Sequence, residues 1–191
     1  MLKKFLLSIV LGGLLAFNAT VSLANDVWLT PAEQNVKVLD PVKLDLWMDF
    51  HDDPTLGSGV DTFYNSGLLS FVSFEFDTTL PGWGKPSGAY YQPTVLPDGE
   101  LNGLGFGDFG GLTGPYKIGT FTFQAINKGK NNVTLQQNDI PLGEFYSANT
   151  FDAQVINFKG AEVNVIPEPV SAILFLFGMD GLGICKKKKE E

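Results

Sequence analysis

The fold is decided by Val42-Lys43-Leu44-Asp45-Leu46-Trp47-Met48-Asp49-Phe50. Every even-numbered position in this stretch is apolar, and three of the four odd-numbered positions are charged. Successive side chains of a β-strand point to opposite faces, so this alternation predicts a strand with one buried and one solvent-facing side. The stretch therefore indicates a sheet that packs one of its faces on a core.

Six further runs on either side of this stretch predict strands, and clusters of Gly, Pro, Asn and Asp separate them. They are Val27–Leu29, Asn35–Leu39, Leu69–Phe76, Tyr116–Ile126, Asn132–Gln136 and Ala153–Val165. No 12-residue stretch of this body has a helical period. Most of the chain's 16 phenylalanines lie in or beside these runs and suit a core between pleated faces. The sequence predicts an all-β fold, a single antiparallel β-sandwich.

The region Leu80–Pro115 is rich in glycine and proline, and we expect long loops there with one short strand around Gly103–Phe106. Its segment Gly103–Gly111 reads GLGFGDFGG, which superficially matches a dinucleotide-binding loop or a calcium-binding Gly-Asp repeat. The first motif needs a βαβ context and the second needs tandem copies, and the sequence offers neither. A flexible loop is the expected structure.

Composition limits the classes of function. Residues 25–166 form a 142-residue body of single-domain size, and the chain's only cysteine, Cys185, lies beyond it. The body contains 7 lysines, no arginine and 17 acidic residues, so its formal charge is 7 − 17 = −10. Such a surface repels nucleic acid and anionic lipid, and we expect no nucleic-acid partner.

The N-terminus has the features of an export signal. Met1–Lys4 is short and basic, and Phe5–Phe17 is an apolar run of 13 residues. Ser22-Leu23-Ala24 then places small residues at the two positions that signal peptidase inspects. We expect residues 1–24 to be a helical signal peptide, cleaved after Ala24, on an exported protein.

The C-terminal segment 167–191 reads PEPVSAILFLFGMDGLGICKKKKEE. Its apolar run, Val170–Cys185, has 16 residues and as a helix would rise roughly 24 Å, short of the ~30 Å hydrocarbon core. Asp180 and three glycines weaken it further as a membrane anchor. We expect a transient inner-membrane tether whose basic cluster stays on the cytoplasmic side. That cluster is Lys186, Lys187, Lys188 and Lys189.

The order of triplet, apolar run and basic cluster resembles the PEP-CTERM sorting signal of Gram-negative, exopolysaccharide-producing bacteria. The resemblance implies that Pro167, Glu168 and Pro169 are the recognition motif of a membrane-embedded exosortase, which cleaves near them. The protein would then be released or transferred to the cell surface. Two departures are the all-lysine cluster followed by glutamates and the aspartate in the apolar run. An ordinary short C-terminal transmembrane anchor is the alternative.

A second resemblance concerns the body. VWLTPAEQNVKVLDPVKLDLWM, LLSFVSFEFDTTL and YKIGTFTFQAINKGKNNVTL resemble successive strands of cohesin-like domains. The likeness covers roughly Val27–Val165 and implies a nine-stranded jelly-roll sandwich related to carbohydrate-binding modules. It does not imply a dockerin partner.

Acidic residues offer the main candidates for chemistry. Asp49, Asp52, Asp53 and Asp61 surround the glycine-containing stretch HDDPTLGSGVD, and oxygen ligands on a loop suit Ca²⁺. The spacing does not match an EF-hand, so a solvated acidic loop is the preferred interpretation. The same interpretation applies to the set Asp98, Glu100 and Asp108. His51, the only histidine, has no nucleophile motif beside it and is expected to be a solvated loop residue.

Aromatic residues in or beside the Gly/Pro-rich region are candidates for stacking on sugar rings, or for packing the loops down. They are Trp83, Tyr90, Tyr91 and Tyr116. The favoured function is a non-enzymatic cell-surface or matrix module that binds exopolysaccharide or another protein, with no required cofactor. The alternatives are a secreted glycoside hydrolase that uses paired carboxylates and a protein–protein adhesion module.

Overall fold

The structure is a computed structural model that describes residues 25–139 and 142–167, and no helix able to cross a membrane occurs in these two ranges. The expected signal-peptide helix and the apolar run of the sorting segment lie outside the described residues. The described chain consists of twelve strands: β1 (Asn25–Thr30), β2 (Glu33–Lys37), β3 (Pro41–Asp49), β4 (Thr55–Phe63), β5 (Leu69–Phe76), β6 (Gly88–Tyr91), β7 (Thr94–Leu96), β8 (Glu100–Leu112), β9 (Tyr116–Ala125), β10 (Gly129–Gln137), β11 (Ile156–Lys159) and β12 (Ala161–Ile166).

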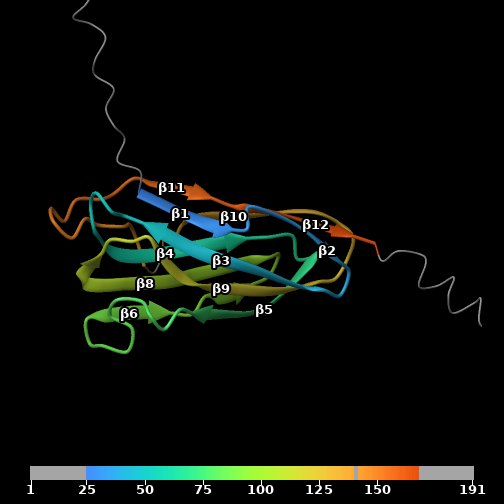
Figure 1. Cartoon of the computed structure of the whole chain (residues 1–191), viewed down its shortest axis with the longest axis horizontal. Coiled ribbons are helices and arrows are strands. Elements are labelled where there is room, and N and C mark those ends of the chain that lie inside the picture. The colour runs from blue at the N-terminus through green and yellow to red at the C-terminus, as the bar shows by residue number, and fades with distance from the viewer. Residues whose placement is uncertain (1–24, 140–141, 168–191) are drawn as a thin grey trace, which may run out of the picture.

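The strands form two facing sheets, which confirms the expected all-β sandwich (Figure 1). One sheet has the order β11-β1-β3-β9-β5. The other has seven strands in the order β2-β12-β10-β4-β8-β6, with β7 also paired to β8. Because sandwiches bury the two inner faces against each other, each long strand presents one apolar side to the other sheet.

The expectation of a purely antiparallel, nine-stranded sandwich was wrong, because the first and last segments each divide between the two sheets. β1 pairs in parallel with β11, and β2 pairs in parallel with β12. The single expected strand Ala153–Val165 is likewise two strands that lie in different sheets. The first and last segments run side by side in the same direction, so the sheets are mixed.

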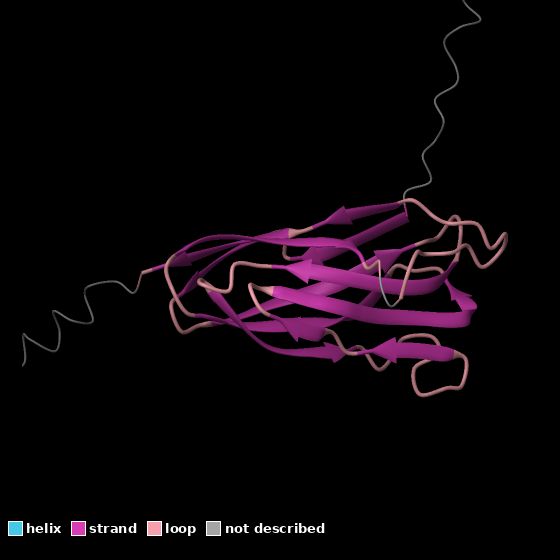
Figure 2. Cartoon of the chain, turned by 180° about the vertical axis from the view of Figure 1, so that it is seen from behind, coloured by secondary structure: helices cyan, strands magenta, loops and turns pink. Residues whose placement is uncertain are grey.

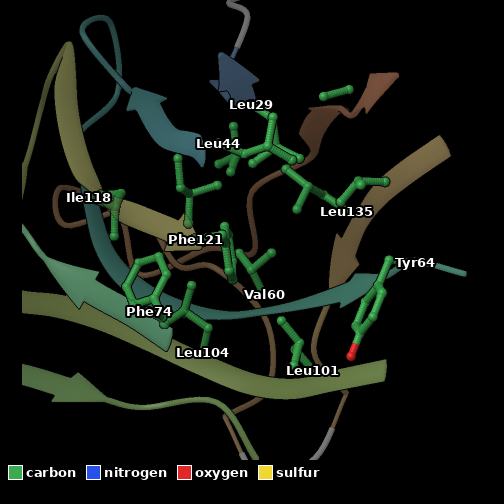
Figure 3. Close-up of a cluster of buried hydrophobic side chains, with 14 of the residues drawn as sticks. Leu29, Leu44, Val60, Tyr64, Phe74, Leu101, Leu104, Ile118, Phe121 and Leu135 are labelled. Carbon is green, nitrogen blue, oxygen red and sulfur yellow. The ribbon is translucent and has the colours of Figure 1, made fainter. Parts of the chain in front are cut away.

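The opening stretch behaves as its alternation predicts. The five apolar side chains at even positions of residues 42–50 are fully buried, whereas the odd positions are at least partly exposed. They join a core that both sheets contribute to, including Leu44, Val60, Leu104 and Phe121 (Figure 3). Phenylalanines and one tyrosine pack closely there, for example Tyr64 on Phe123 with ring centroids 5.0 Å apart.

The prediction of long loops over Leu80–Pro115 was wrong. The region holds β6, β7 and the 13-residue strand β8, and the missed strand β4 pairs with β8. Glycines obscure the alternation in both strands, and packing explains why they are glycines. A Cβ on Gly57 would lie 2.1 Å from the Phe106 carbonyl oxygen, and one on Gly105 would lie 2.8 Å from Leu142.

The sandwich has two distinct ends, which lie at opposite ends of the long axis in Figure 2. The loop end, as we call it, carries the start of β1 and the connections 50–54, 77–87, 113–115 and 142–155. The exit end carries the end of β12 at Ile166 and the turns 38–40, 64–68, 97–99 and 126–128. The positions of the candidate residues are described below relative to these two ends.

Candidate functional site

Asp53 is held at the centre of a hydrogen-bond network at the loop end. Its carboxylate accepts bonds from the Ser147 hydroxyl at 2.6 Å and from the Gln154 side-chain amide at 2.9 Å. These bonds, that from Ser147 above all, lower the pKa of the Asp53 carboxyl below its usual value of 3.8. The network ties the β3–β4 connection to residues about 100 positions later.

The other three carboxylates of the calcium hypothesis lie apart from this network. Asp61 is buried in β4, roughly 20 Å along the strand from Thr55, and accepts bonds from Gly103 N at 2.8 Å and Asn138 Nδ2 at 2.9 Å. Asp49 accepts a bond from the backbone N–H of His51 at 3.1 Å, and Asp52 is exposed. The structure therefore does not bring the four together.

No group of three or more carboxylate, histidine or cysteine side chains converges within residues 25–139 and 142–167. The second acidic set is also dispersed, because Glu100 begins β8 at the exit end whereas Asp108 approaches its other end. Asp108 instead accepts a bond from Gly110 N at 2.7 Å and from the Ser87 hydroxyl at 3.3 Å. Asp108 thus caps the local turn at Gly110 and also holds Ser87.

Two of the four aromatic candidates pack together. Trp83 and Tyr90 lie 5.1 Å apart between ring centroids, and both contact Phe76 of β5. The Tyr90 hydroxyl donates to the Pro81 carbonyl, and burial, with a smaller effect of the Asp108 carboxylate, raises the pKa of Tyr90 to about 12. These rings fix the β5–β6 connection against the sandwich.

The remaining two aromatic candidates differ in exposure. Tyr116 is partly buried against the core, with its hydroxyl 3.4 Å from that of Thr113. Tyr91 is 54% exposed and borders a hollow of about 130 Å³ on the outer face of β4 and β8. Leu56, Ala89, Phe106 and Leu142 form most of the hollow's wall. Of the four candidate rings, Tyr91 is therefore the one that is exposed for stacking, and the four do not form a platform.

The loop end carries the most exposed large apolar side chains of the described chain. Val155 is 90% exposed, Phe109 79% and Phe151 70%. Sequence reasoning did not single out these residues. Phe109 was assigned to a flexible loop and Val155 to the expected strand Ala153–Val165, and Phe151 was assigned to no element. An aromatic residue among Asn, Thr and Asp in Asn149–Asp152 was the available signal.

The segment that carries Phe151 is a small, braced hairpin. Tyr146 and Ala153 form an isolated bridge, and Ser147 N donates to the Asp152 carbonyl at 2.9 Å. The base is anchored by Phe145, which is fully buried and stacks on Phe50 with a centroid distance of 5.7 Å. Phe151 itself has φ 63°, a left-handed conformation that is rare for a bulky side chain.

The surroundings of these apolar side chains are acidic. The loop-end connections 50–54, 77–87, 113–115 and 142–155 contain one lysine, Lys85, and five acidic residues: Asp52, Asp53, Asp77, Glu144 and Asp152. Exposed apolar groups with a charged rim are the common composition of a protein-binding surface. The loop end is therefore the candidate functional site.

Comparisons with known proteins agree on the fold. No family model and no curated protein matches the chain. Among solved structures, the chain is similar to a protein of the type I cohesin–dockerin complex from Clostridium thermocellum, with 10% identity, a TM-score of 0.59, and coverage of 75% of this chain and 99% of that one.

Two further structures match in the same way. The seventh ScaB type I cohesin from Pseudobacteroides cellulosolvens gives 12% identity and a TM-score of 0.58 over 76% of this chain and 94% of that one. The cohesin module of a family 33 glycoside hydrolase from Clostridium perfringens gives 10% identity and a TM-score of 0.56 over 77% and 100%. Residues 25–166 thus have the fold of cohesin modules.

Proposed function

We propose that this chain is an exported, non-enzymatic binding protein whose sandwich engages a protein partner at the cell surface through its loop end. The observation that carries the proposal is that the three most exposed large apolar side chains of the described residues, Phe109, Phe151 and Val155, lie at one end of the sandwich. A partner with an apolar patch and a basic rim fits this acidic, apolar surface.

The fold supports a binding role. Cohesin modules share this architecture, and one of the similar structures is a complex of a cohesin with a dockerin. Aromatic side chains that are exposed on a braced hairpin lose little conformational entropy when they are covered, so they suit a binding hot spot. The Asp53 network and the buried Phe145 provide that bracing.

The end of the last strand supports sorting by the C-terminal segment. β12 ends at Ile166, one residue before the Pro-Glu-Pro triplet, and Pro167 is exposed. A processing enzyme could therefore reach the triplet without unfolding the sandwich. We infer that signal peptidase and an exosortase remove the two ends.

The binding proposal is tested by replacing the three side chains together, Phe109→Ser, Phe151→Ser and Val155→Ser. Purified wild-type and variant chains are used to capture proteins from the surface fraction of the producing bacterium, with Val72→Ser as a matched control. Val72 is 59% exposed on β5, away from the loop end. We expect one partner to be captured by the wild type and the control and lost with the triple variant.

Two results would contradict this proposal. Capture that survives in the triple variant would place the binding surface elsewhere. Binding to an exopolysaccharide array, lost with Tyr91→Ala and not with the triple variant, would favour the carbohydrate-binding alternative.

Sorting is tested separately by intact mass: a cell-surface form that retains Lys186–Lys189 would exclude cleavage near the triplet.

A further inference from the structure

At the exit end, exposed apolar side chains lie beside the point where the chain leaves the sandwich. Leu39 is 69% exposed, Ile166 38% and Ile126 36%. Backbone hydrogen bonds place them side by side: Val38 N donates to the Ile166 carbonyl at 3.3 Å, and Leu39 N donates to the Ala125 carbonyl at 2.8 Å. The three aliphatic side chains, here called the exit cluster, therefore share one neighbourhood.

Lysines surround the exit cluster although the body is strongly acidic. Four of the seven lysines between residues 25 and 166 lie at this end: Lys37, Lys43, Lys128 and Lys130. Lys130 is paired with Glu162 at 2.7 Å. No ion pair within the described part of the chain involves the other three, and all three are exposed. The acidic side chains at this end are Asp40 and Asp98 in the turns, Glu100 at the start of β8, and Glu162, the partner of Lys130.

The length of the connecting chain fixes where this end must lie. Four Cα–Cα steps separate Ile166 from Val170, where the apolar run begins, so the two are at most about 14 Å apart even when fully extended. The headgroup layer on each side of a bilayer is roughly 5–8 Å thick. If the apolar run enters the membrane, the exit cluster lies at or near headgroup depth.

From this we propose that the exit end is a membrane-seating surface, on which the tethered precursor rests against the bilayer before it is cleaved. Leu39, Ile126 and Ile166 would insert between headgroups, and Lys37, Lys43 and Lys128 would contact lipid phosphates. The acidic loop end, at the other end of the long axis, would point away from the surface. The body as a whole repels anionic lipid, and this end carries four of its seven lysines, so it is the part of the surface best suited to the contact.

The inference rests on the proposed membrane tether, and the experiment separates the two. The full chain is expressed in a Gram-negative host without an exosortase, with Leu39→p-benzoylphenylalanine, and irradiated in isolated membranes. We expect a covalent phospholipid adduct at position 39. The matched control, Val72→p-benzoylphenylalanine, has similar exposure in the middle of β5 and should give at least fivefold less adduct.

Three other outcomes would overturn the proposal. A membrane-bound chain with no more lipid adduct at 39 than at 72 would refute the seating surface and leave the tether intact. An adduct of position 39 with a protein would show that a protein, not lipid, covers this end. A chain absent from the membrane fraction would refute both the tether and the seating surface.

The basic side chains give a second, independent measurement on the same chain. Lys37→Gln combined with Lys128→Gln removes two exposed charges that have no ion-pair partner among residues 25–139 and 142–167, so the fold should be unaffected. We expect the adduct at position 39 to fall at least twofold in membranes rich in anionic lipid. No change on this substitution would show that lipid charge does not position the exit end.

Discussion

The two ends of this sandwich are fixed by different chemistry. At the loop end, the Asp53 carboxylate holds Ser147 and Gln154, which lie about 100 residues further along the chain. At the exit end, the side-chain amide of buried Asn131 holds the turn after β4, through two bonds of 3.2 Å to the backbone of Asn65. A carboxylate changes charge with pH and an amide does not. The Asp53 network is therefore expected to loosen in acid, and the contact between Asn131 and Asn65 is not.

The ends also share one feature that packing does not explain. Each displays a large apolar residue in the left-handed region, Leu39 with φ 72° at the exit end and Phe151 with φ 63° at the loop end. Both side chains are about 70% exposed. Left-handed backbone costs a non-glycine residue about 1–2 kcal/mol. Strain combined with exposure marks both positions as candidates for contact with something outside the fold.

The largest expected effect on stability is at Phe145, the buried anchor of the loop-end hairpin, and it should be far larger than the effect at Phe151, the exposed tip. Phe145→Ala should lower the free energy of unfolding by about 3–5 kcal/mol, because it removes a buried ring that contacts Phe50, Phe106 and Phe158. Phe151→Ala, at the exposed tip, should change it by less than about 0.5 kcal/mol. Chemical denaturation measures both. Equal losses would show that the tip belongs to the core.

The second largest effect on stability is expected for the side-chain amide of Asn131 at the exit end. Asn131→Ala should lower the free energy of unfolding by about 2 kcal/mol, because two hydrogen bonds to the Asn65 backbone are lost. The loss should be the same at neutral and acidic pH, since no group of this pair titrates. Asn35→Ala is the control, because it removes one exposed side-chain bond to Asn164 and should cost about 0.5 kcal/mol. A loss that varies with pH would break the comparison.

The carboxylate at the loop end should give a smaller and pH-dependent effect. Its pKa in the fold lies below 3.8, so its contribution to stability is present above pH 3.8 and is lost as the pH falls through the folded pKa. Asp53→Asn should therefore cost about 1 kcal/mol at pH 7, and this difference should shrink below pH 3.8. Denaturation curves of both proteins across this range test it. A constant difference would mean that packing, not charge, holds the loop.

The sequence anticipated the parts of this molecule that depend on side-chain alternation. Apolar groups recur at every second position of Val42–Phe50, most of which forms β3. β5 coincides with the expected strand Leu69–Phe76, although its alternation shifts at Val72. β4 and β8 could not be found in this way, because Gly57 and Gly107 are required by close backbone contacts and carry no side chain to alternate. Glycine is normally a sign of turns, and here it marks a tightly packed strand pair.

The candidate site was harder to predict because it depends on contacts between distant segments. Asp53 was identified as an acidic loop residue, but nothing near it in the sequence points to Ser147 and Gln154. Trp83 and Tyr90 look alike as loop aromatics, and only the fold shows that they pack on Phe76. Phe109 is exposed because its side chain lies on the solvent-facing side of β8. A segment that is expected to be a loop has no defined faces, so this exposure could not be predicted.

The smallest expected effect tests the feature that the two ends share. Leu39→Gly and Phe151→Gly each relieve left-handed strain of about 1–2 kcal/mol, against roughly 0.5–1 kcal/mol of added freedom in the unfolded chain. Little burial is lost because both side chains are exposed. Each variant should therefore gain about 0.5 kcal/mol of stability in chemical denaturation. Leu96→Gly serves as a control at an exposed position without a left-handed backbone.

If either change lowers the free energy of unfolding by more than about 1 kcal/mol, the side chain supports its own turn. That position would then no longer be a candidate for contact with a partner or with lipid. A gain in both would mean that these residues are retained against stability. The two variants should then separate by function. Leu39→Gly would reduce contact with lipid and leave partner capture unchanged, whereas Phe151→Gly would do the reverse, because the two ends are directed at different targets.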